Sequence, residues 1–370
     1  MTRKNILILV VVLALIAGAI FYLESLKPQR SSIPVGENSV QHDPAAETPD
    51  YASRSKEFPL AQELVRPDGY LNADESLTIQ SLVGKKVILV DFWTYSCINC
   101  QRTQPYLNAW YEKYADEGLE IIGVHTPEFG FEQERANVEA AIVRDSIRYP
   151  VVQDNAYATW DAYQNRYWPR KYLIDINGLV VYDHIGEGSY EETERMIQKY
   201  LEERKEVLGE EGAVPAGLVS PGVVIEASSP ETYFGWGRNE LLANGTPRAE
   251  GAQTLDAAAP YAPNKLYLEG TWDIEEEYAV NTDGSASIVY SYDAKSVYFV
   301  ASSDEGVTVQ VLRDGVPVIG GEGSDVDANG NVFIQEARMY TLIEQEDASK
   351  HVIEIRVLGP GLKAFTFTFG

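Results

Sequence analysis

The chain has 370 residues, which is enough for two soluble domains that each bury a full hydrophobic core. It contains 56 acidic and 30 basic residues, so its formal net charge is -26. Because binding to phosphate groups or to anionic lipid headgroups needs a basic face, this charge excludes a nucleic-acid-binding protein and disfavours attachment to lipid headgroups.

The first segment along the chain is apolar and uncharged, over residues 5–23. A helix of this length, rising about 1.5 Å per residue, spans nearly the whole hydrocarbon core of a bilayer. Arg3 and Lys4 precede it, which predicts residues 1–4 in the cytoplasm, a single-pass membrane anchor over residues 5–24 and soluble domains outside the cell membrane, either periplasmic or at the cell surface. A cleaved secretory signal is the alternative, since residues 17–19 fit a small-residue cleavage pattern.

Two segments divide the rest of the chain. Residues 25–55 are rich in Pro, Ser, Ala and acidic residues without apolar periodicity, which predicts a flexible linker. Residues 209–220 combine Gly, Pro and consecutive glutamates. They predict a second linker between a domain of residues 56–208 and a domain of residues 221–370.

The only two cysteines form a C-x-x-C pair, Cys97 and Cys100, directly after an apolar run. Residues 87–93 read as a buried strand, and the apolar and aromatic spacing that follows predicts a helix that begins at the cysteines and runs to residue 114. A helix N-terminus favours a thiolate over a thiol. We therefore expect Cys97 to have a lowered pKa and to be the nucleophile, with Cys100 as the resolving thiol.

Two other uses of a C-x-x-C pair fit less well. A zinc site would need a second pair or suitably spaced histidines, and the four histidines show no such spacing. A structural disulfide would close too short a loop to restrain the unfolded chain. The sequence predicts a redox pair with no metal and no cofactor.

Residues 87–93 followed by Cys97 and Cys100 resemble the active-site strand and helix of thioredoxins. The resemblance implies that Asp91 is a buried carboxylate that accepts and returns protons, rather than a strand-end residue facing water. Trp93, in the same Asp-Phe-Trp motif, is a further candidate. Ser96 and the residues between the cysteines depart from the usual thioredoxin motif, so the direction of electron flow stays open.

The elements that follow extend this resemblance. The pattern predicts strands at residues 118–124, 149–154, 168–175 and 179–184, and helices at residues 132–146, 156–165 and 191–207. This order places an extra helix and strand inside an α/β thioredoxin fold and resembles the TlpA-like branch. That branch contains extracytoplasmic, often membrane-tethered, thiol-disulfide oxidoreductases.

The TlpA-like resemblance implies three more site residues. Pro169 occupies the place of a cis-proline that packs against the disulfide; an ordinary trans proline is the alternative. Trp168 replaces the small or β-branched residue usual before that proline. Glu128 lies where some TlpA-like reductases place an acid that tunes the thiols, although a solvated loop glutamate fits equally well. We interpret His125 as a packed strand-end histidine.

Four sequence segments are similar to the soluble redox domain of DipZ-type proteins. They are FWTYSCINCQRTQPYLNAW, GVHTPEF, YPVVQDNAYATW and RYWPRKYLID. In that family a multi-span electron transporter precedes the redox domain, and a β-sandwich resembling carbohydrate-binding modules follows it. The likeness covers residues 56–370. It implies that a separate membrane electron-transfer partner serves this chain.

Short alternating segments predict an all-β second domain. They lie at residues 287–292, 296–301, 307–311, 351–358 and 364–369, separated by Asp-Gly and Asn-Gly turns, and they resemble a jelly-roll sandwich. Phe365, Phe367 and Phe369 are expected to form one core-facing stripe. A glycan or cell-envelope ligand could stack on the aromatic residues Tyr233, Phe234, Trp236, Trp272 and Tyr278, but a core role, and docking of a partner or of the first domain, are the alternatives.

Together these features predict a membrane-tethered, extracytoplasmic thiol-disulfide oxidoreductase that acts on disulfide- or thiol-bearing client proteins. One alternative is a surface or glycan-binding scaffold protein in which the redox domain has a minor role. A peroxidase that uses one cysteine is another.

Overall fold

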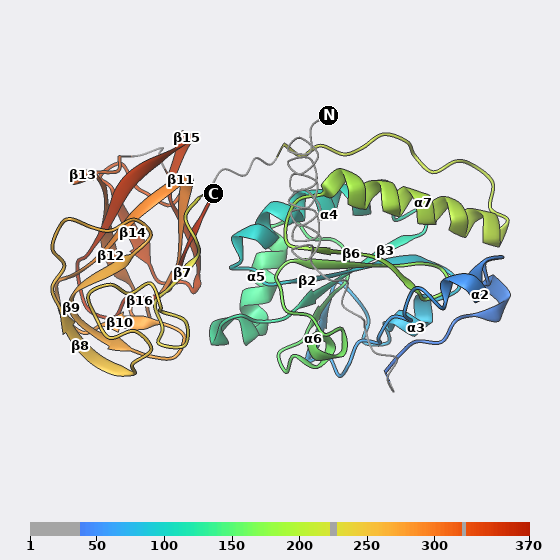
Figure 1. Cartoon of the computed structure of the whole chain (residues 1–370), viewed down its shortest axis with the longest axis horizontal. Helices are drawn as coiled ribbons and strands as arrows, with labels where there is room; N and C mark the ends of the chain where they lie inside the picture. Colours follow the sequence, from blue (N-terminus) through green and yellow to red (C-terminus); the bar gives the residue numbers. More distant parts are fainter. Residues whose placement is uncertain (1–37, 223–227, 320–322) are drawn as a thin grey trace, which may run out of the picture.

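The computed structural model describes residues 38–222, 228–319 and 323–370. Figure 1 shows an α/β domain beside an all-β domain, here called the α/β domain and the β domain. The predicted anchor at residues 5–24 lies outside the described residues. Within the described ranges, no helix is both long and apolar enough to cross a membrane.

The α/β domain is built on a six-stranded sheet with the strand order β1-β4-β3-β2-β5-β6. β2 pairs parallel with β3, and β3 with β4, whereas β1, β5 and β6 are antiparallel to their neighbours. The strands are β1 (Gly69–Leu71), β2 (Val87–Trp93), β3 (Leu119–His125), β4 (Val151–Gln153), β5 (Arg170–Ile174) and β6 (Val180–Ile185). The helices are α3 (Ile79–Leu82), α4 (Ile98–Tyr114), η2 (Gly130–Gln133), α5 (Arg135–Arg144), α6 (Ala158–Ala162) and α7 (Tyr190–Leu208).

Strand β2 lies inside the sheet and is buried on both faces, as its continuous apolar run predicts. Its side chains alternate between two apolar clusters. Leu89 packs on the face that α4 and α7 cover, together with Trp110 and Leu201. Phe92 packs on the opposite face with Tyr163 of the segment after α6. The arrangement of one sheet between two helical layers is a thioredoxin-like fold, and it places the end of β2 and the start of α4 at one edge of the sheet.

Part of the expected flexible linker is ordered against the α/β domain. Residues 38–54 contain η1 (Pro44–Ala46) and α2 (Tyr51–Arg54). The Arg54 guanidinium forms ion pairs of 2.6 Å with Asp175 and 2.5 Å with Glu203. The expectation of an unstructured segment is wrong for these residues, because distant acids that the local composition does not reveal hold the arginine. Residues 25–37 of that linker lie outside the described residues.

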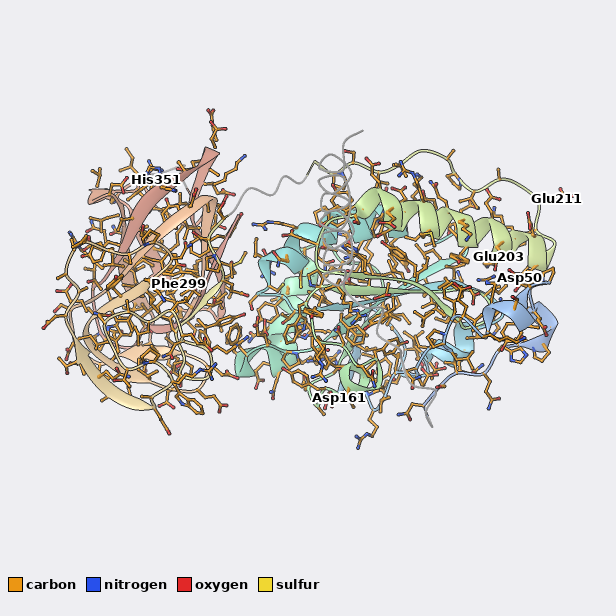
Figure 2. All side chains as sticks on the ribbon, in the orientation of Figure 1. Asp50, Asp161, Glu203, Glu211, Phe299 and His351 are labelled. Carbon is orange, nitrogen blue, oxygen red and sulfur yellow. The ribbon has the colours of Figure 1, made fainter. Side chains whose placement is uncertain are left out.

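The β domain consists of antiparallel strands around one apolar core. The strands are β7 (Thr232–Tyr233), β8 (Gly251–Leu255), β9 (Leu266–Ile274), β10 (Ala279–Asn281), β11 (Ala286–Ser302), β12 (Val307–Arg313), β13 (Val316–Pro317), β14 (Asn331–Ile334), β15 (Arg338–Val357) and β16 (Lys363–Phe369). The long strand β11 pairs with β9 near its start, with β16 near its end and with β15 along both parts. Phe299 of β11 is labelled inside this core in Figure 2. An all-β domain is confirmed, and the finer jelly-roll assignment stays a prediction.

The expected phenylalanine stripe on β16 is broken at Phe365. Phe367 and Phe369 pack in the core of the β domain. The pairing with β11 skips Phe365, since Val300 pairs with Thr366 and Ala301 with Ala364. A bulge of this kind turns the extra side chain to the other face of the strand. Phe365 therefore points at the α/β domain, and the prediction of a single stripe is wrong at this position.

Candidate active site

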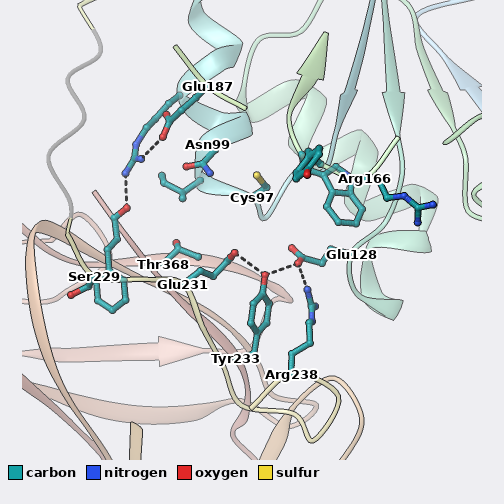
Figure 3. Close-up of a pocket in the computed structure, with 15 residues that line it drawn as sticks. Cys97, Asn99, Glu128, Arg166, Glu187, Ser229, Glu231, Tyr233, Arg238 and Thr368 are labelled. Atoms are coloured by element: carbon teal, nitrogen blue, oxygen red, sulfur yellow. Dashed lines mark hydrogen bonds and ion pairs between the residues drawn. The ribbon is translucent and has the colours of Figure 1, made fainter. Parts of the chain in front are cut away.

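The two cysteines lie at the N-terminus of α4, as the sequence predicts. Cys97 is the residue that caps the helix, and its Sγ accepts a hydrogen bond of 3.3 Å from the backbone N–H of Cys100. Both thiols are free; Cys97 is half-buried and Cys100 is buried. In Figure 3 the Cys97 sulfur faces a pocket. Cys97 is thus the accessible thiol, and Cys100 lies behind it.

The prediction of a lowered pKa for Cys97 is wrong. Burial raises the pKa of Cys97, and the negative charges of Glu128 and Glu231 add to the increase. The hydrogen bonds from Cys100 oppose this effect but are weaker than the burial. Burial also raises the pKa of Cys100 well above its usual range. Because burial and nearby negative charges raise the pKa of both thiols, each needs a proton acceptor before it can act as a nucleophile.

Asp91 is a fully buried carboxyl group near the middle of the sheet. It lies on β2 opposite Lys171 of β5, and neither of its oxygens has a hydrogen-bond partner among the described residues. Burial raises the pKa of Asp91 to about 7, while the charge of Lys171 acts in the opposite direction. A carboxyl with this pKa can release and accept a proton near neutral pH.

The Trp168–Pro169 peptide bond is cis, as predicted, and it precedes β5. Trp168 forms part of the pocket wall, and its Nε1 donates a hydrogen bond of 3.0 Å to the carbonyl of Thr126. Trp93 is buried behind the site, where its ring lies edge-on to His125 at 5.0 Å. Trp93 therefore does not reach the pocket in which Cys97 is exposed.

His125 and Glu128 follow each other closely at the end of β3 but have different surroundings. His125 is fully buried, and burial lowers its pKa to about 3, so it stays neutral and packed as the sequence interpretation expected. Glu128 is not a solvated loop glutamate. Its carboxylate accepts hydrogen bonds from Tyr233 at 2.9 Å and from Arg238 at 2.6 Å, and both partners belong to the β domain.

Glu132 is a buried acid that the sequence analysis did not identify. One carboxylate oxygen accepts hydrogen bonds from the backbone and the hydroxyl of Ser96, and the other accepts from the backbone of Glu128 and Phe129. Burial raises its pKa to about 7. Glu132 thus fastens the loop before Cys97 to the loop after β3. The only local signal was an acid in the first turn of a helical segment.

The β domain closes the other side of the site. The pocket has a volume of about 490 Å³ and lies between the two domains (Figure 3). Its lining from the α/β domain includes Cys97, Asn99, Arg102, Glu128, Arg166 and Trp168, and its lining from the β domain includes Glu231, Tyr233, Arg238 and Phe369. In the sequence these two groups belong to separate domains, and contact between the domains was expected only as one alternative role of Tyr233 and the other aromatic residues.

An apolar cluster holds the domains together beside this pocket. Ile98, which lies between the two cysteines in the sequence, packs there with Phe129 of the α/β domain and with Phe365 of the β domain. Arg102 Nη2 donates a hydrogen bond of 3.0 Å to the carbonyl of Phe369. The active-site helix therefore contacts the β domain directly.

The aromatic residues considered for glycan stacking do not form an exposed platform. Phe234 and Trp272 are buried in the core of the β domain, and Trp236 packs against that core. Tyr233 and Tyr278 lie against the cluster between the domains. These side chains fit the structural alternative, in which they build the β domain and its contact with the α/β domain. Among the described residues no group of three or more His, Cys, Asp or Glu side chains could hold a metal ion.

Comparisons with known proteins agree with this site. The model of the AhpC/TSA family matches residues 60–183, and the model described as a thioredoxin-like C-terminal domain matches residues 229–370. The thiol-disulfide oxidoreductase ResA of Halalkalibacterium halodurans is 33% identical over 128 residues, which are 35% of this chain and 67% of ResA. The chain belongs to the thioredoxin-like thiol-disulfide oxidoreductases.

Two further relatives match longer stretches of the chain. The thiol-disulfide oxidoreductase YkuV of Bacillus subtilis is 28% identical over 141 residues, which are 38% of this chain and 93% of YkuV. The DipZ protein of Mycobacterium bovis is 36% identical over 324 residues, which are 87% of this chain and 44% of DipZ. The chain thus matches less than half the length of DipZ, and that match extends over both domains.

Proposed function

We propose that this protein is a membrane-tethered, extracytoplasmic thiol-disulfide oxidoreductase that exchanges disulfides with client proteins through Cys97 and Cys100. The observation that carries the proposal is the pair itself, with Cys97 facing the pocket and Cys100 buried behind it. Tethering and compartment rest on the apolar sequence of residues 5–23 and on the basic residues before it.

The reaction begins when the Cys97 thiolate attacks one sulfur of a client disulfide. A bond forms between Cys97 and that sulfur, the client disulfide breaks, and the second client sulfur leaves with the electron pair and takes up a proton. Cys100 then loses its proton and attacks the Cys97 sulfur. The bond between Cys97 and the client breaks, and the first client sulfur leaves with the electron pair and takes up a proton. The products are a Cys97–Cys100 disulfide and a reduced client, and two electrons have passed to the client.

Asp91 is the proton acceptor that we assign to Cys100. Both groups are buried, and the charges of Cys97 and Asp91 are among the factors that raise the pKa of Cys100. With its own pKa raised to about 7, Asp91 is partly ionised at neutral pH and can take the Cys100 proton in the resolving step. A separate membrane electron-transfer partner would then reduce the disulfide again.

The test is reduction of insulin disulfides with dithiothreitol as the electron source. The Cys97→Ser variant of the full chain is expected to lose the reaction, because no thiol faces the pocket. The Cys100→Ser variant, reduced and then mixed with insulin in the absence of dithiothreitol, is expected to complete the first step only and to accumulate a mixed disulfide with the client. Full insulin reduction by Cys97→Ser would refute the mechanism.

The direction of electron flow is decided by the reduction potential of the Cys97–Cys100 pair. A potential near that of thioredoxin, about -270 mV, corresponds to a reductase, and a value near that of DsbA, about -120 mV, corresponds to a disulfide donor. Equilibration of the full chain with glutathione buffers measures it directly.

A further inference from the structure

Two carboxylates from different domains meet at one phenol in the pocket that Cys97 faces (Figure 3). The Tyr233 hydroxyl lies 2.9 Å from Glu128 Oε1 and 2.7 Å from Glu231 Oε2. A phenol has one hydrogen and donates it to only one of these carboxylates. The other carboxyl forms a hydrogen bond to the phenol oxygen only if it carries a proton itself. Both contacts of the Tyr233 hydroxyl are therefore hydrogen bonds when the two carboxyl groups hold one proton between them.

The surrounding charges place that proton on Glu231. Arg238 donates a hydrogen bond of 2.6 Å to Glu128, which therefore acts as the acceptor, and the guanidinium lies 3.7 Å from the centre of the Tyr233 ring. Tyr233 then donates to Glu128 and accepts from Glu231. Protein atoms around Glu231, followed by the charge of Glu128, raise the pKa of Glu231 to about 7, although this side chain still reaches the solvent of the pocket.

We infer that Glu128, Tyr233 and Glu231 form an acid pair, built across the two domains, that exchanges a proton with the reacting sulfurs on the Cys97 side. The inference rests on the proposed function, since it adds a second proton-exchanging group to that reaction. Asp91 lies behind the cysteines, whereas this pair lines the pocket in front of Cys97. The β domain thus contributes chemistry, not only a contact surface.

The proton follows a closed path. The pair takes the proton of the Cys97 thiol as the thiolate forms. The thiolate attacks the client disulfide, the new bond to Cys97 forms, and the client sulfur that leaves with the electron pair receives the same proton from the acid pair. The carboxyl groups end in the protonation state in which they began, and no electron passes through them.

Several other charged or titratable groups surround the pair. They are Arg238 of the β domain, and Glu132, Tyr157 and Arg166 of the α/β domain. Glu132 is the group that a test must separate from the pair, since its pKa is also raised to about 7. It is unchanged in the variants below, so any difference between them does not come from Glu132.

The experiment measures the rate at which iodoacetamide alkylates Cys97 as a function of pH. It uses the full chain with Cys100→Ser, so that one thiol reacts. As the pair loses its shared proton between about pH 6 and 8, its added negative charge raises the pKa of Cys97. The alkylation rate then increases less than tenfold for each pH unit, so the plot of its logarithm against pH flattens in this range. With Glu231→Gln this flattening is expected to disappear, and alkylation at about pH 8 is expected to be about threefold to tenfold faster.

Glu277→Gln is the matched control. Its carboxylate also crosses the domain boundary, where it accepts a hydrogen bond of 2.9 Å from the backbone of Gly130, but it does not line the pocket. We expect Glu277→Gln to keep the parent profile and Tyr233→Phe, which removes the shared hydroxyl, to change it. Tyr233→Phe also serves if Glu231→Gln fails to fold.

Two results would overturn the inference. One is a Glu231→Gln profile that retains the flattening, and the other is a Glu277→Gln profile that changes to the same extent. Either result leaves the insulin test of Cys97→Ser unaffected, because alkylation needs no client and no Cys100. Failure of the acid pair and failure of the proposed function are therefore distinguishable.

Discussion

Replacing Asp91 by asparagine is expected to stabilise the α/β domain, and the gain should grow with pH. In the unfolded chain an aspartate has a pKa of about 3.9. In the folded protein burial raises the pKa of Asp91 to about 7, so the folded state binds the proton more tightly. The stability that the neutral carboxyl confers is fully present below pH of about 3.9 and is lost as the pH rises through about 7.

The size of the effect follows from the difference of about three pKa units. Each unit is worth about 1.4 kcal/mol, so ionisation of Asp91 lowers the free energy of unfolding by about 4 kcal/mol once the pH exceeds about 7. At pH of about 5.5 the loss is about 2 kcal/mol. Asparagine stays neutral in both states and avoids this loss. Asp91→Asn should therefore gain about 2 kcal/mol at pH of about 5.5 and about 4 kcal/mol at pH of about 8.5.

The assay is urea unfolding followed by pulse alkylation of Cys100, with Cys97→Ser in the background. Cys100 is buried in the α/β domain, so its labelling reports the unfolding of that domain and not of the β domain. Asp161→Asn is the control, because Asp161 lies at the surface (Figure 2). Its effect on stability should not grow with pH. A gain for Asp91→Asn that is the same at both pH values, or a loss at the higher one, would refute the reasoning.

Two further changes test the surroundings of the site. Lys171→Met removes the buried cation that lowers the pKa of Asp91 in the folded state, so the pH at which the stability loss from Asp91 levels off should rise by about one unit or more in the same urea series. The onset of the loss depends on the unfolded chain and should stay near pH of about 3.9; an unchanged upper limit would contradict the assigned role of Lys171. Phe365→Ala removes the aromatic ring that packs 4.8 Å from Phe131 across the domain boundary, and such truncations in buried clusters cost about 3–5 kcal/mol. Cys97 should then be alkylated faster at a fixed pH, whereas Phe333→Ala, at an exposed aromatic residue of the same domain, should not change the rate.

Local sequence patterns predicted the framework of the site. The apolar run before the cysteines defined β2, and helical spacing defined α4 with Cys97 at its start. These elements follow from interactions between residues a few positions apart, which one sequence displays directly. The burial of Asp91 was predictable for the same reason, because its sequence neighbours on both sides are apolar.

Contacts between residues far apart in the chain could not be predicted from the sequence. The pairing of Arg54 with Asp175 ordered a segment whose composition resembles a flexible linker. The bulge on β16 turned Phe365 away from the stripe that strict alternation predicts. In both cases the deciding partner lies far away in the sequence, and nothing in the local pattern marks it.

By itself the sequence determined that this protein has a thioredoxin-type strand and helix with Cys97 and Cys100 at their junction, since that junction depends on local periodicity. Only the tertiary structure decided the chemistry around Cys97. A helix N-terminus alone would lower the pKa of its thiol, but burial beneath the β domain and the carboxylates of Glu128 and Glu231 raise it. Electrostatic effects on the pKa of a thiol depend on distance in space and on exclusion of water, so they follow from the contact between the two domains and not from the local sequence.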